Sequence, residues 1–216
     1  MKKVVLIVLA VLIVLIIIAF MGFRGMMRGP DLSAYESLRE PRVSTMASQR
    51  MLVAELKGDP NQVGGKAFGA LFKTFYQLKG VPKAGPPPAP RARWPLPLNT
   101  PKAEWVGVYG MPIPATVEAL PEKADPLVKI GIWEYGTVAE ILHIGPYNEE
   151  SPTVEKLVSF IKQKGYQVIG DHEEEYLRGP GMFGKGDPKR YYTIIRYRVE
   201  KVPADSMARQ EKPQGK

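Results

Sequence analysis

The chain of 216 residues is long enough for one ordinary domain of about 150 residues with appendages. It contains no cysteine, which excludes disulfide bonds and a cysteine-ligated zinc site. The formal net charge is +8, but the basic residues lie mostly in the first half and the tail, and the half that contains "HEEEYL" is slightly acidic. We therefore expect no nucleic-acid partner.

The N-terminal segment predicts a single membrane anchor in residues 1–23. After the basic start "MKK", an unbroken apolar run extends from Val4 to Met21. As a helix this run would be roughly 27 Å long, close to the thickness of a bilayer's hydrocarbon core. A cleaved signal peptide is the alternative, but "IAFMGFRGMM" lacks a clear small-x-small cleavage site. Basic residues nearly balance across the span, and we favour a domain that faces the outside or periplasm over one that faces the cytoplasm.

The first half of the domain predicts a strand, a helix and a second strand. Residues 24–43 are polar with prolines, which indicates a linker, and residues 44–57 predict the first strand. A helix follows from Asn61 as N-cap until Gly80 ends it. The prolines after this helix exclude a central strand there, although "ARWPL" suits an edge strand or a pocket rim. Residues 104–112 predict the next strand.

The second half repeats this order of elements. Residues 128–143 are extended, and Ser151 as N-cap with Pro152 at the first helical position begins a second helix, which Gly165 ends. The segments "GYQVIGDHEEEYL" and "YYTIIRYRV" predict the last strands. The polar residues 201–216 predict a disordered tail.

These elements predict an α+β fold of two β-α-β-β units, residues 44–112 and 128–200, related by a pseudo-twofold axis. The strand-to-helix junctions "VAELKGDPNQVGG" and "AEILHIGPYNEES" are similar, and each helix ends in a Lys-Gly step. We expect both helices on one face of a mainly antiparallel sheet. A groove between the two units is then a natural ligand site.

The segment "HEEEYL" is the strongest candidate for such a site. In a strand, alternation places His172, Glu174 and Tyr176 on one face. Glu173 and Glu175 point the other way and are predicted to be solvated. The alternative is a charged edge strand without any site.

Three segments, "AEILHIGPYNEESPTVEKLVSFIKQKGY", "HEEEYL" and "YYTIIRYRV", resemble the GyrI-like small-molecule-binding domain over roughly residues 44–200. The pattern H-x-E-x-Y-L followed by a T-x-x-R strand is similar to members described as cyclopropanoid hydrolases, and other members are drug-sensing domains of transcription activators. The resemblance implies a central groove with aromatic walls and an acidic residue at its floor. That residue corresponds to Glu174, and the family's tyrosine to Tyr176.

Further aromatic residues suit the walls of this pocket, although ordinary core packing explains them equally well. They are Trp133, Tyr135, Trp105, Tyr109 and Tyr147. For Arg196 we expect a structural ion pair. His143 and His172 are the only histidines, so we assign no metal and no cofactor.

Three functions remain open at this point. The first is a membrane-anchored module that binds amphipathic, aromatic or cationic small molecules. The second is a hydrolase in which Glu174 activates water or attacks a strained electrophile, with Tyr176 as hydrogen-bond donor, so that these two residues are catalytic. The third is a membrane-tethered interaction scaffold. We expect no transcription-factor role, because no helix-turn-helix segment precedes the domain.

Overall fold

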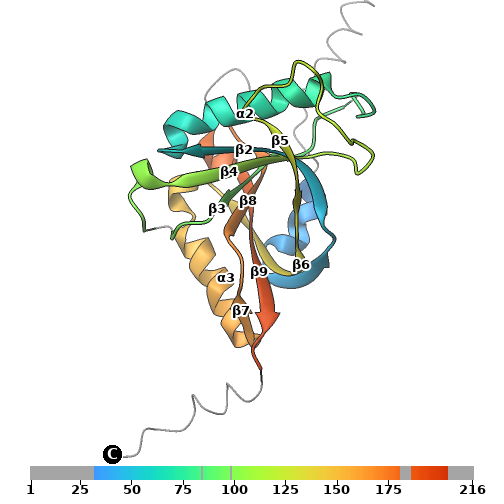
Figure 1. The fold of residues 1–216 in the computed structure, drawn as a ribbon. Coiled ribbons are helices and arrows are strands. Elements are labelled where there is room, and N and C mark those ends of the chain that lie inside the picture. The colour runs from blue at the N-terminus through green and yellow to red at the C-terminus, as the bar shows by residue number, and fades with distance from the viewer. Residues whose placement is uncertain (1–31, 84, 98, 181–185, 204–216) are drawn as a thin grey trace, which may run out of the picture.

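The computed structural model describes residues 32–83, 85–97, 99–180 and 186–203 (Figure 1). The anchor predicted for residues 1–23 lies outside these residues, as does nearly all of the predicted tail. Within the described part, no helix is long and apolar enough to cross a membrane.

The described residues form a twisted antiparallel sheet with two α-helices (Figure 1). The sheet order is β1-β6-β9-β8-β3-β4-β2-β5, and the short strand β7 pairs with β9. All pairings are antiparallel, which confirms the predicted α+β class. The elements are β1 (Arg42–Met46), β2 (Gln49–Lys57), α2 (Pro60–Gln77), β3 (Arg91–Trp94), β4 (Val106–Pro112), β5 (Lys129–Trp133), β6 (Gly136–Ile144), α3 (Ser151–Gln163), β7 (Tyr166–Val168), β8 (His172–Arg178) and β9 (Tyr192–Lys201).

The two halves of the sheet have matching connectivity. The first half runs β2-α2-β3-β4 and the second runs β6-α3-β8-β9, with β7 added after α3. In the sheet, the halves meet where β3 pairs with β8. The strand that precedes each half pairs with the other half, β1 with β6 and β5 with β2. This connectivity is as expected for two related units, and their superposition about a pseudo-twofold axis stays a prediction.

Both helices cover the same face of the sheet, because directly paired residues of antiparallel strands point to the same side. A row of paired residues crosses the sheet from β2 to β6 and consists of Ala54, Tyr109, Ala92, Glu174, Ile195 and Ile141. Its first three members belong to the apolar core under α2, and its last two to the core under α3. Glu174 therefore lies on this helix-covered face, between two apolar cores.

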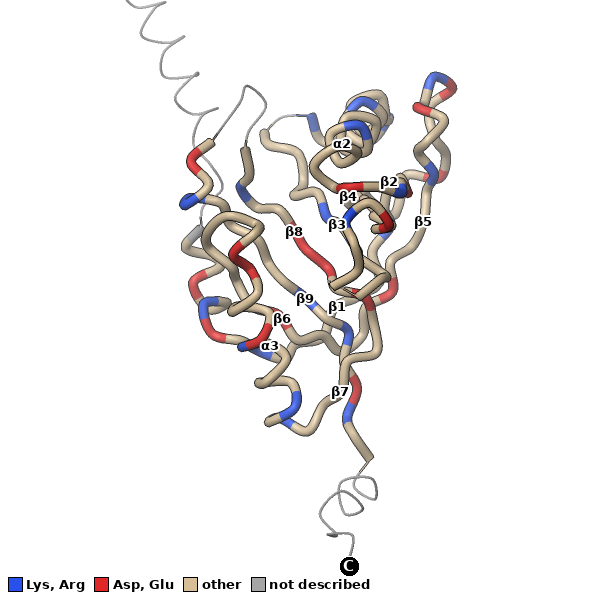
Figure 2. The backbone as a smooth tube through the Cα atoms, turned by 90° about the vertical axis from the view of Figure 1, so that its left-hand side faces the viewer, with Lys and Arg blue, Asp and Glu red and all other residues tan. Residues whose placement is uncertain are grey.

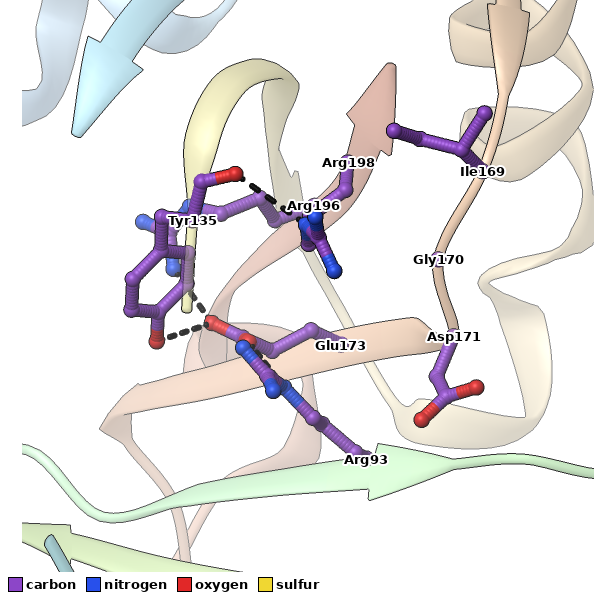
Figure 3. A pocket seen from close by; sticks show the side chains of 8 residues that line it. All are labelled: Arg93, Tyr135, Ile169, Gly170, Asp171, Glu173, Arg196 and Arg198. Atoms are coloured by element: carbon purple, nitrogen blue, oxygen red, sulfur yellow. Dashed lines mark hydrogen bonds and ion pairs between the residues drawn. The ribbon is translucent and has the colours of Figure 1, made fainter. Parts of the chain in front are cut away.

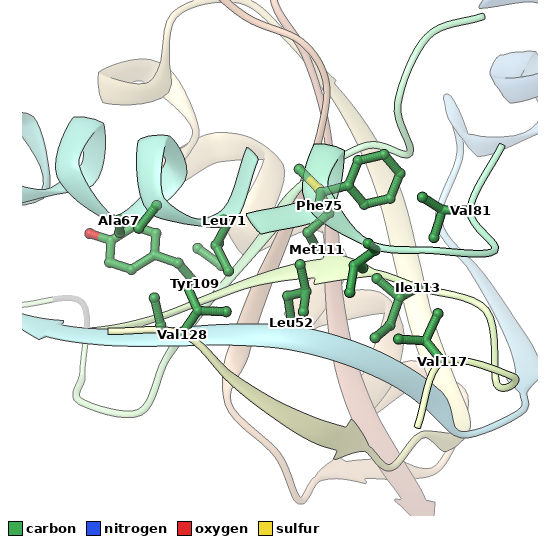
Figure 4. Close-up of a cluster of buried hydrophobic side chains, with 14 of the residues drawn as sticks. Leu52, Ala67, Leu71, Phe75, Val81, Tyr109, Met111, Ile113, Val117 and Val128 are labelled. Atoms are coloured by element: carbon green, nitrogen blue, oxygen red, sulfur yellow. The ribbon is translucent and has the colours of Figure 1, made fainter. Parts of the chain in front are cut away.

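The core under α2 holds the first half together (Figure 4). Ala67, Leu71 and Phe75 recur on one side of α2 and are buried against Leu52 and Met111 of the sheet. Burial of a side chain of this size contributes roughly 1.5 to 3 kcal/mol. The apolar spacing seen in the sequence thus fixes which side of α2 faces the sheet.

Two of the predicted helix boundaries need correction. The side chain of Asp59, not Asn61, caps α2, since its Oδ1 accepts a hydrogen bond from the Asn61 backbone N–H at 2.9 Å. Ser151 is the first residue of α3, and Glu150 occupies the N-cap position. In both cases the helix begins earlier than the sequence pattern indicated, with Pro60 as the first helical residue of α2 and Pro152 as the second of α3.

The prediction that prolines exclude a central strand after α2 is wrong. β3 lies inside the sheet, between β4 and β8. Its residues Arg91–Trp94 are free of proline and keep every backbone N–H for the ladder, while Pro90 and Pro95 stand just outside. A strand this short fits between prolines, and β8 consequently has a partner on each side and is not an edge strand.

Candidate functional site

His172, Glu174 and Tyr176 come together on the helix-covered face, as alternation along β8 predicted. The carboxylate of Glu174 accepts a hydrogen bond from the Tyr176 hydroxyl at 2.6 Å through Oε2. Its Oε1 lies 3.0 Å from His172 Nε2. Glu174 is only 8% exposed, so this carboxylate is largely removed from water.

A third partner of Glu174 comes from β3. The indole Nε1 of Trp94 donates a hydrogen bond to Glu174 Oε1 at 2.9 Å. Sequence reasoning placed "ARWPL" at a pocket rim at most and did not single out this tryptophan. The alternation in "RARW" was the available signal, since it sends Ala92 and Trp94 to the same face. In the described part of the chain, no Lys or Arg forms a hydrogen bond or ion pair with Glu174.

Aromatic rings from both halves surround this carboxylate. Trp94 packs on Trp105 and Tyr109, with ring centroids 5.1 and 5.8 Å apart. Tyr176 packs on Phe68 of α2 at 5.7 Å and on Tyr147 at 5.6 Å. Three predicted aromatic residues, Trp105, Tyr109 and Tyr147, therefore belong to this cluster. Of the aromatic side chains in the cluster, that of Tyr147 is the one classed as exposed, at 39%.

The phenols near Glu174 are held in their protonated, hydrogen-donating form. Burial and the charge of Glu174 raise the pKa of Tyr109 to about 12. The same causes raise the pKa of Tyr176 well above its ordinary value. The hydroxyl of Tyr109 is buried and has no hydrogen-bond partner among the described residues.

A second carboxyl group, which sequence reasoning missed, lies beside this site. Glu150 stands at the N-cap of α3 and is 7% exposed. Burial and the nearby charge of Glu174 raise the pKa of Glu150 to about 9. One donor atom each of Glu150, His172 and Glu174 lies within 4.8 Å of the others. In the sequence "NEES", Glu149 and Glu150 looked alike, and only packing of α3 distinguishes them.

The opposite face of β8 carries a buried ion-pair network, so the prediction that Glu173 and Glu175 are solvated is wrong. Glu173 is 3% exposed and Glu175 is 9% exposed. Arg196 reaches both of them, at 2.8 and 3.1 Å, and Glu140 at 3.0 Å. Figure 2 shows the acidic stretch of β8 inside the molecule, with basic positions on the neighbouring strands β3 and β9. The expected structural role of Arg196 agrees with these contacts.

Two members of this network, Glu140 and Arg196, hold each other in their charged forms. Burial on its own raises the pKa of Glu140, but the ion pairs with Arg196 and Arg42 outweigh burial and leave that pKa below its ordinary value. Burial likewise opposes the charge of Arg196, yet its three carboxylate partners raise the pKa of its guanidinium. Glu140 and Arg196 are therefore both ionised at neutral pH.

Trp133 and Tyr135 belong to this opposite face and do not line the surroundings of Glu174. The Arg93 guanidinium stacks 4.1 Å above the Trp133 ring. The Tyr135 hydroxyl donates to Glu173 at 2.9 Å and accepts from Arg91 at 2.6 Å. Trp133 ends β5 and Tyr135 lies in the short connection to β6. Both rings face the network, so the alternation in "GIWEYG" correctly placed them on one face, but that face is the one opposite Glu174.

A polar cavity of about 140 Å³ opens beside the network (Figure 3). Arg93, Tyr135 and Arg196 converge there on Glu173 (Figure 3). Glu173 is paired with Arg93 and Arg196 here, and the cavity is on the side of the sheet away from Glu174. It is lined by Arg93, Tyr135, Ile169, Gly170, Asp171, Glu173, Arg196 and Arg198.

The fold has clear relatives among solved structures. A hydrolase from Listeria innocua is 21% identical, with a TM-score of 0.64 over 78% of this chain and 98% of that chain. The C-terminal domain of EcmrR is 15% identical, with a TM-score of 0.56 over 76% of this chain and 98% of that one. EcmrR in a complex with DNA is 16% identical, with a TM-score of 0.59 over 79% of this chain and 61% of that one. At such identities the likeness establishes the fold alone.

Sequence comparison identifies the family directly. No curated protein matches the chain. The model of the GyrI-like small molecule binding domain, however, matches residues 39–198, which include both halves of the sheet and every residue around Glu174. The protein therefore belongs to the GyrI-like small-molecule-binding domain family.

Proposed function

We propose that the protein binds an amphipathic aromatic cation, with Glu174 as the counter-charge. The observation that carries the proposal is the carboxylate of Glu174. It is 8% exposed, and Trp94 and Tyr176 donate hydrogen bonds to it. A buried carboxylate is usually paired with Lys or Arg, as the network on the opposite face is. Among the described residues no Lys or Arg pairs with Glu174, and a ligand cation would supply the opposite charge.

The aromatic cluster suits the same ligand. Rings from β3, β4, α2 and the turn before α3 meet around Glu174. A cation above an aromatic face gains about 0.5 to 2 kcal/mol per contact, and flat apolar groups gain from burial between the rings. Because Glu174 is almost fully covered, the ligand must displace a side chain, and the exposed Tyr147 is the one at the surface.

We further propose that this binding domain is tethered to a membrane by residues 1–23 and faces the outside or periplasm. The support is the apolar run from Val4 to Met21 and the length of a helix made from it. Tethering would hold the site near the bilayer, where amphipathic cations accumulate. EcmrR is described in a complex with DNA, and for this chain the absence of a nucleic-acid partner stays a prediction.

Titration of the full-length protein with ethidium, a flat aromatic cation, tests the binding proposal. Glu174→Gln removes the charge at nearly constant volume, and we expect the binding free energy to weaken by roughly 1 to 3 kcal/mol. Glu149→Gln, at an exposed position close by, should leave affinity unchanged. Equal affinities of the wild type and Glu174→Gln would rule the proposal out.

A second candidate function is hydrolysis of a strained, cyclopropane-containing electrophile. The observation in its favour is the 2.6 Å hydrogen bond from the Tyr176 hydroxyl to Glu174, which places an acid and a base side by side. A related structure is also described as a hydrolase. In this reaction Glu174 would activate water or attack the ring carbon, and Tyr176 would stabilise the developing charge.

An assay of ring opening separates the two candidates. If the protein is an enzyme, Glu174→Gln should abolish turnover and Tyr176→Phe should reduce it, while both variants still bind a neutral aromatic ligand. A protein that only binds shows no turnover above the uncatalysed rate, even as wild type.

A further inference from the structure

We propose that Glu150, His172 and Glu174 form a binding site for a divalent transition metal ion of the Zn²⁺ type. This goes beyond the capture of an organic cation. The three side chains offer an imidazole nitrogen and two carboxylates, all buried, with one donor atom of each within 4.8 Å of the others. From the sequence we assigned no metal, because the chain has only two histidines and no cysteine.

The spacing of the donors on β8 suits a metal ion. Zn²⁺ binds imidazole nitrogen and carboxylate oxygen at about 2.0 to 2.2 Å. Two ligands at neighbouring positions around such an ion are then about 3.0 to 3.5 Å apart. His172 Nε2 and Glu174 Oε1 are 3.0 Å apart already. The ligand atom of Glu150 lies within 4.8 Å of a donor atom of each, and a bound ion would draw it closer.

The carboxyl group of Glu150 gives independent support for a cation at this site. Its Oε1 is buried and has no hydrogen-bond partner among the described residues. Its backbone is fixed, because its carbonyl accepts the N–H groups of Thr153 and Val154 at 2.9 and 3.0 Å, in the first turn of α3. A buried carboxyl oxygen without a partner is costly, so the fold holds Glu150 here at the expense of stability. A bound cation would remove that cost.

The residues around the three donors orient them as metal sites require. The far nitrogen of His172, Nδ1, hydrogen-bonds the Tyr197 hydroxyl at 2.7 Å, so Nε2 faces the carboxylates. Trp94 and Tyr176 hold the two oxygens of Glu174. Such outer partners fix ring orientation and carboxylate direction in metal sites. Tyr197 is thus a positioning residue for His172.

The chemistry of the donors selects the ion. Mg²⁺ and Ca²⁺ prefer oxygen ligands alone, and an imidazole in the set disfavours them. Zn²⁺ and Co²⁺ accept nitrogen and oxygen together. Three protein ligands would leave the fourth position of a tetrahedral ion open.

The test measures metal content and spectrum of the full-length protein. After incubation with Zn²⁺ and dialysis, we expect about one ion per wild-type chain and none in Glu150→Gln. Glu149→Gln, one residue away and exposed, should keep the ion. Substitution with Co²⁺ should produce visible absorption in the wild type, and Tyr197→Phe should shift that spectrum and weaken affinity by about 10- to 100-fold.

The outcomes also separate this proposal from the binding of organic cations. Glu150→Gln should lose Zn²⁺ but still bind ethidium, whereas Glu174→Gln should weaken both. A wild type that retains no Zn²⁺, or a Glu150→Gln variant that retains it fully, overturns the metal site without affecting the ethidium result. If the wild type retains Zn²⁺ but does not bind ethidium, the proposed function is refuted and the metal site is supported.

Discussion

Three consecutive glutamates of β8 have different partners, because successive side chains of a strand point to opposite faces. Glu174 faces the helices and meets indole, phenol and imidazole groups. Glu173 and Glu175 face the other side and meet arginines from β3 and β9. One strand thus serves a candidate ligand site on one face and a structural ion-pair network on the other.

This division predicts that Glu173→Gln weakens the fold. Glu173 accepts hydrogen bonds from Arg93, Tyr135 and Arg196 at 2.7, 2.9 and 2.8 Å. Removing one charge from a buried network leaves the opposite charges uncompensated, and we expect the free energy of unfolding to fall by about 3 kcal/mol. Chemical denaturation measures it. The exposed Glu155→Gln on α3 serves as control and should change stability little; equal stability of the two variants would mean that the network is solvated after all.

The buried His143 predicts a loss of stability in mild acid. Burial lowers the pKa of His143, and this outweighs the opposing effects of the Pro146 carbonyl and the charges of Glu174 and Glu149. The unfolded chain therefore binds a proton more readily than the folded one, and stability falls as pH drops below the ordinary histidine value of about 6.5. Unfolding measured between pH 7.5 and 5 should show a smaller loss in His143→Gln than in the wild type. If His143→Gln loses as much stability as the wild type over this pH range, groups other than His143 cause the acid sensitivity.

At the scale of elements, α2 is an amphipathic helix whose exposed side contains glycines that lower its stability. Its buried residues face the sheet, and Asp59 caps its start. Two glycines, Gly65 and Gly69, are exposed in its interior, and a Cβ at either position would meet no atom within 4 Å. A glycine inside a helix costs roughly 0.5 to 1 kcal/mol relative to alanine.

Gly69→Ala should accordingly stabilise the protein by roughly 0.5 to 1 kcal/mol, measured as a higher midpoint of thermal unfolding. Gly80, after the helix, provides a control for which we expect the opposite effect. Its φ of +77° is a left-handed conformation that alanine adopts at a cost of about 1 to 2 kcal/mol. Gly80→Ala should therefore destabilise. The same sign of effect for both variants would contradict this account of α2 and its end.

At the scale of the whole molecule, the candidate site depends on how the two halves meet. β3 of the first half pairs with β8 of the second, and this pairing brings Trp94 opposite His172. α2 contributes Phe68 from one side, and the turn before α3 contributes Tyr147 and Glu150 from the other. Neither half contains the site by itself.

A further prediction for the whole chain is that it associates with a membrane. Full-length protein should sediment with membranes and resist extraction with alkaline carbonate, because the run from Val4 to Met21 is long enough to span the apolar layer. A truncated chain that begins at Asp31 should remain in the supernatant. Recovery of the mature protein in solution, with a new N-terminus after residue 20, would instead identify a cleaved signal peptide.

The sequence by itself determined those features that depend on local periodicity. The apolar spacing of α2 and α3 predicted both helices, and alternation in "HEEEYL" predicted that Glu174 shares a face with His172 and Tyr176. The three motifs also identified the GyrI-like family, which the family comparison confirms. These features could be read directly because side-chain direction follows from helix and strand geometry alone.

Only the tertiary structure decided what each face meets. Alternation separates Glu173 from Glu174 but does not say that arginines of β3 and β9 will bury it, since that depends on strand order. The same holds for Trp133, whose ring stacks on Arg93 on the face of the sheet opposite Glu174. Glu150 and Trp94 reach the site through packing of α3 and through pairing of β3 with β8. Contacts between residues distant in sequence arise from the register of strands and the docking of helices, and no local pattern encodes them.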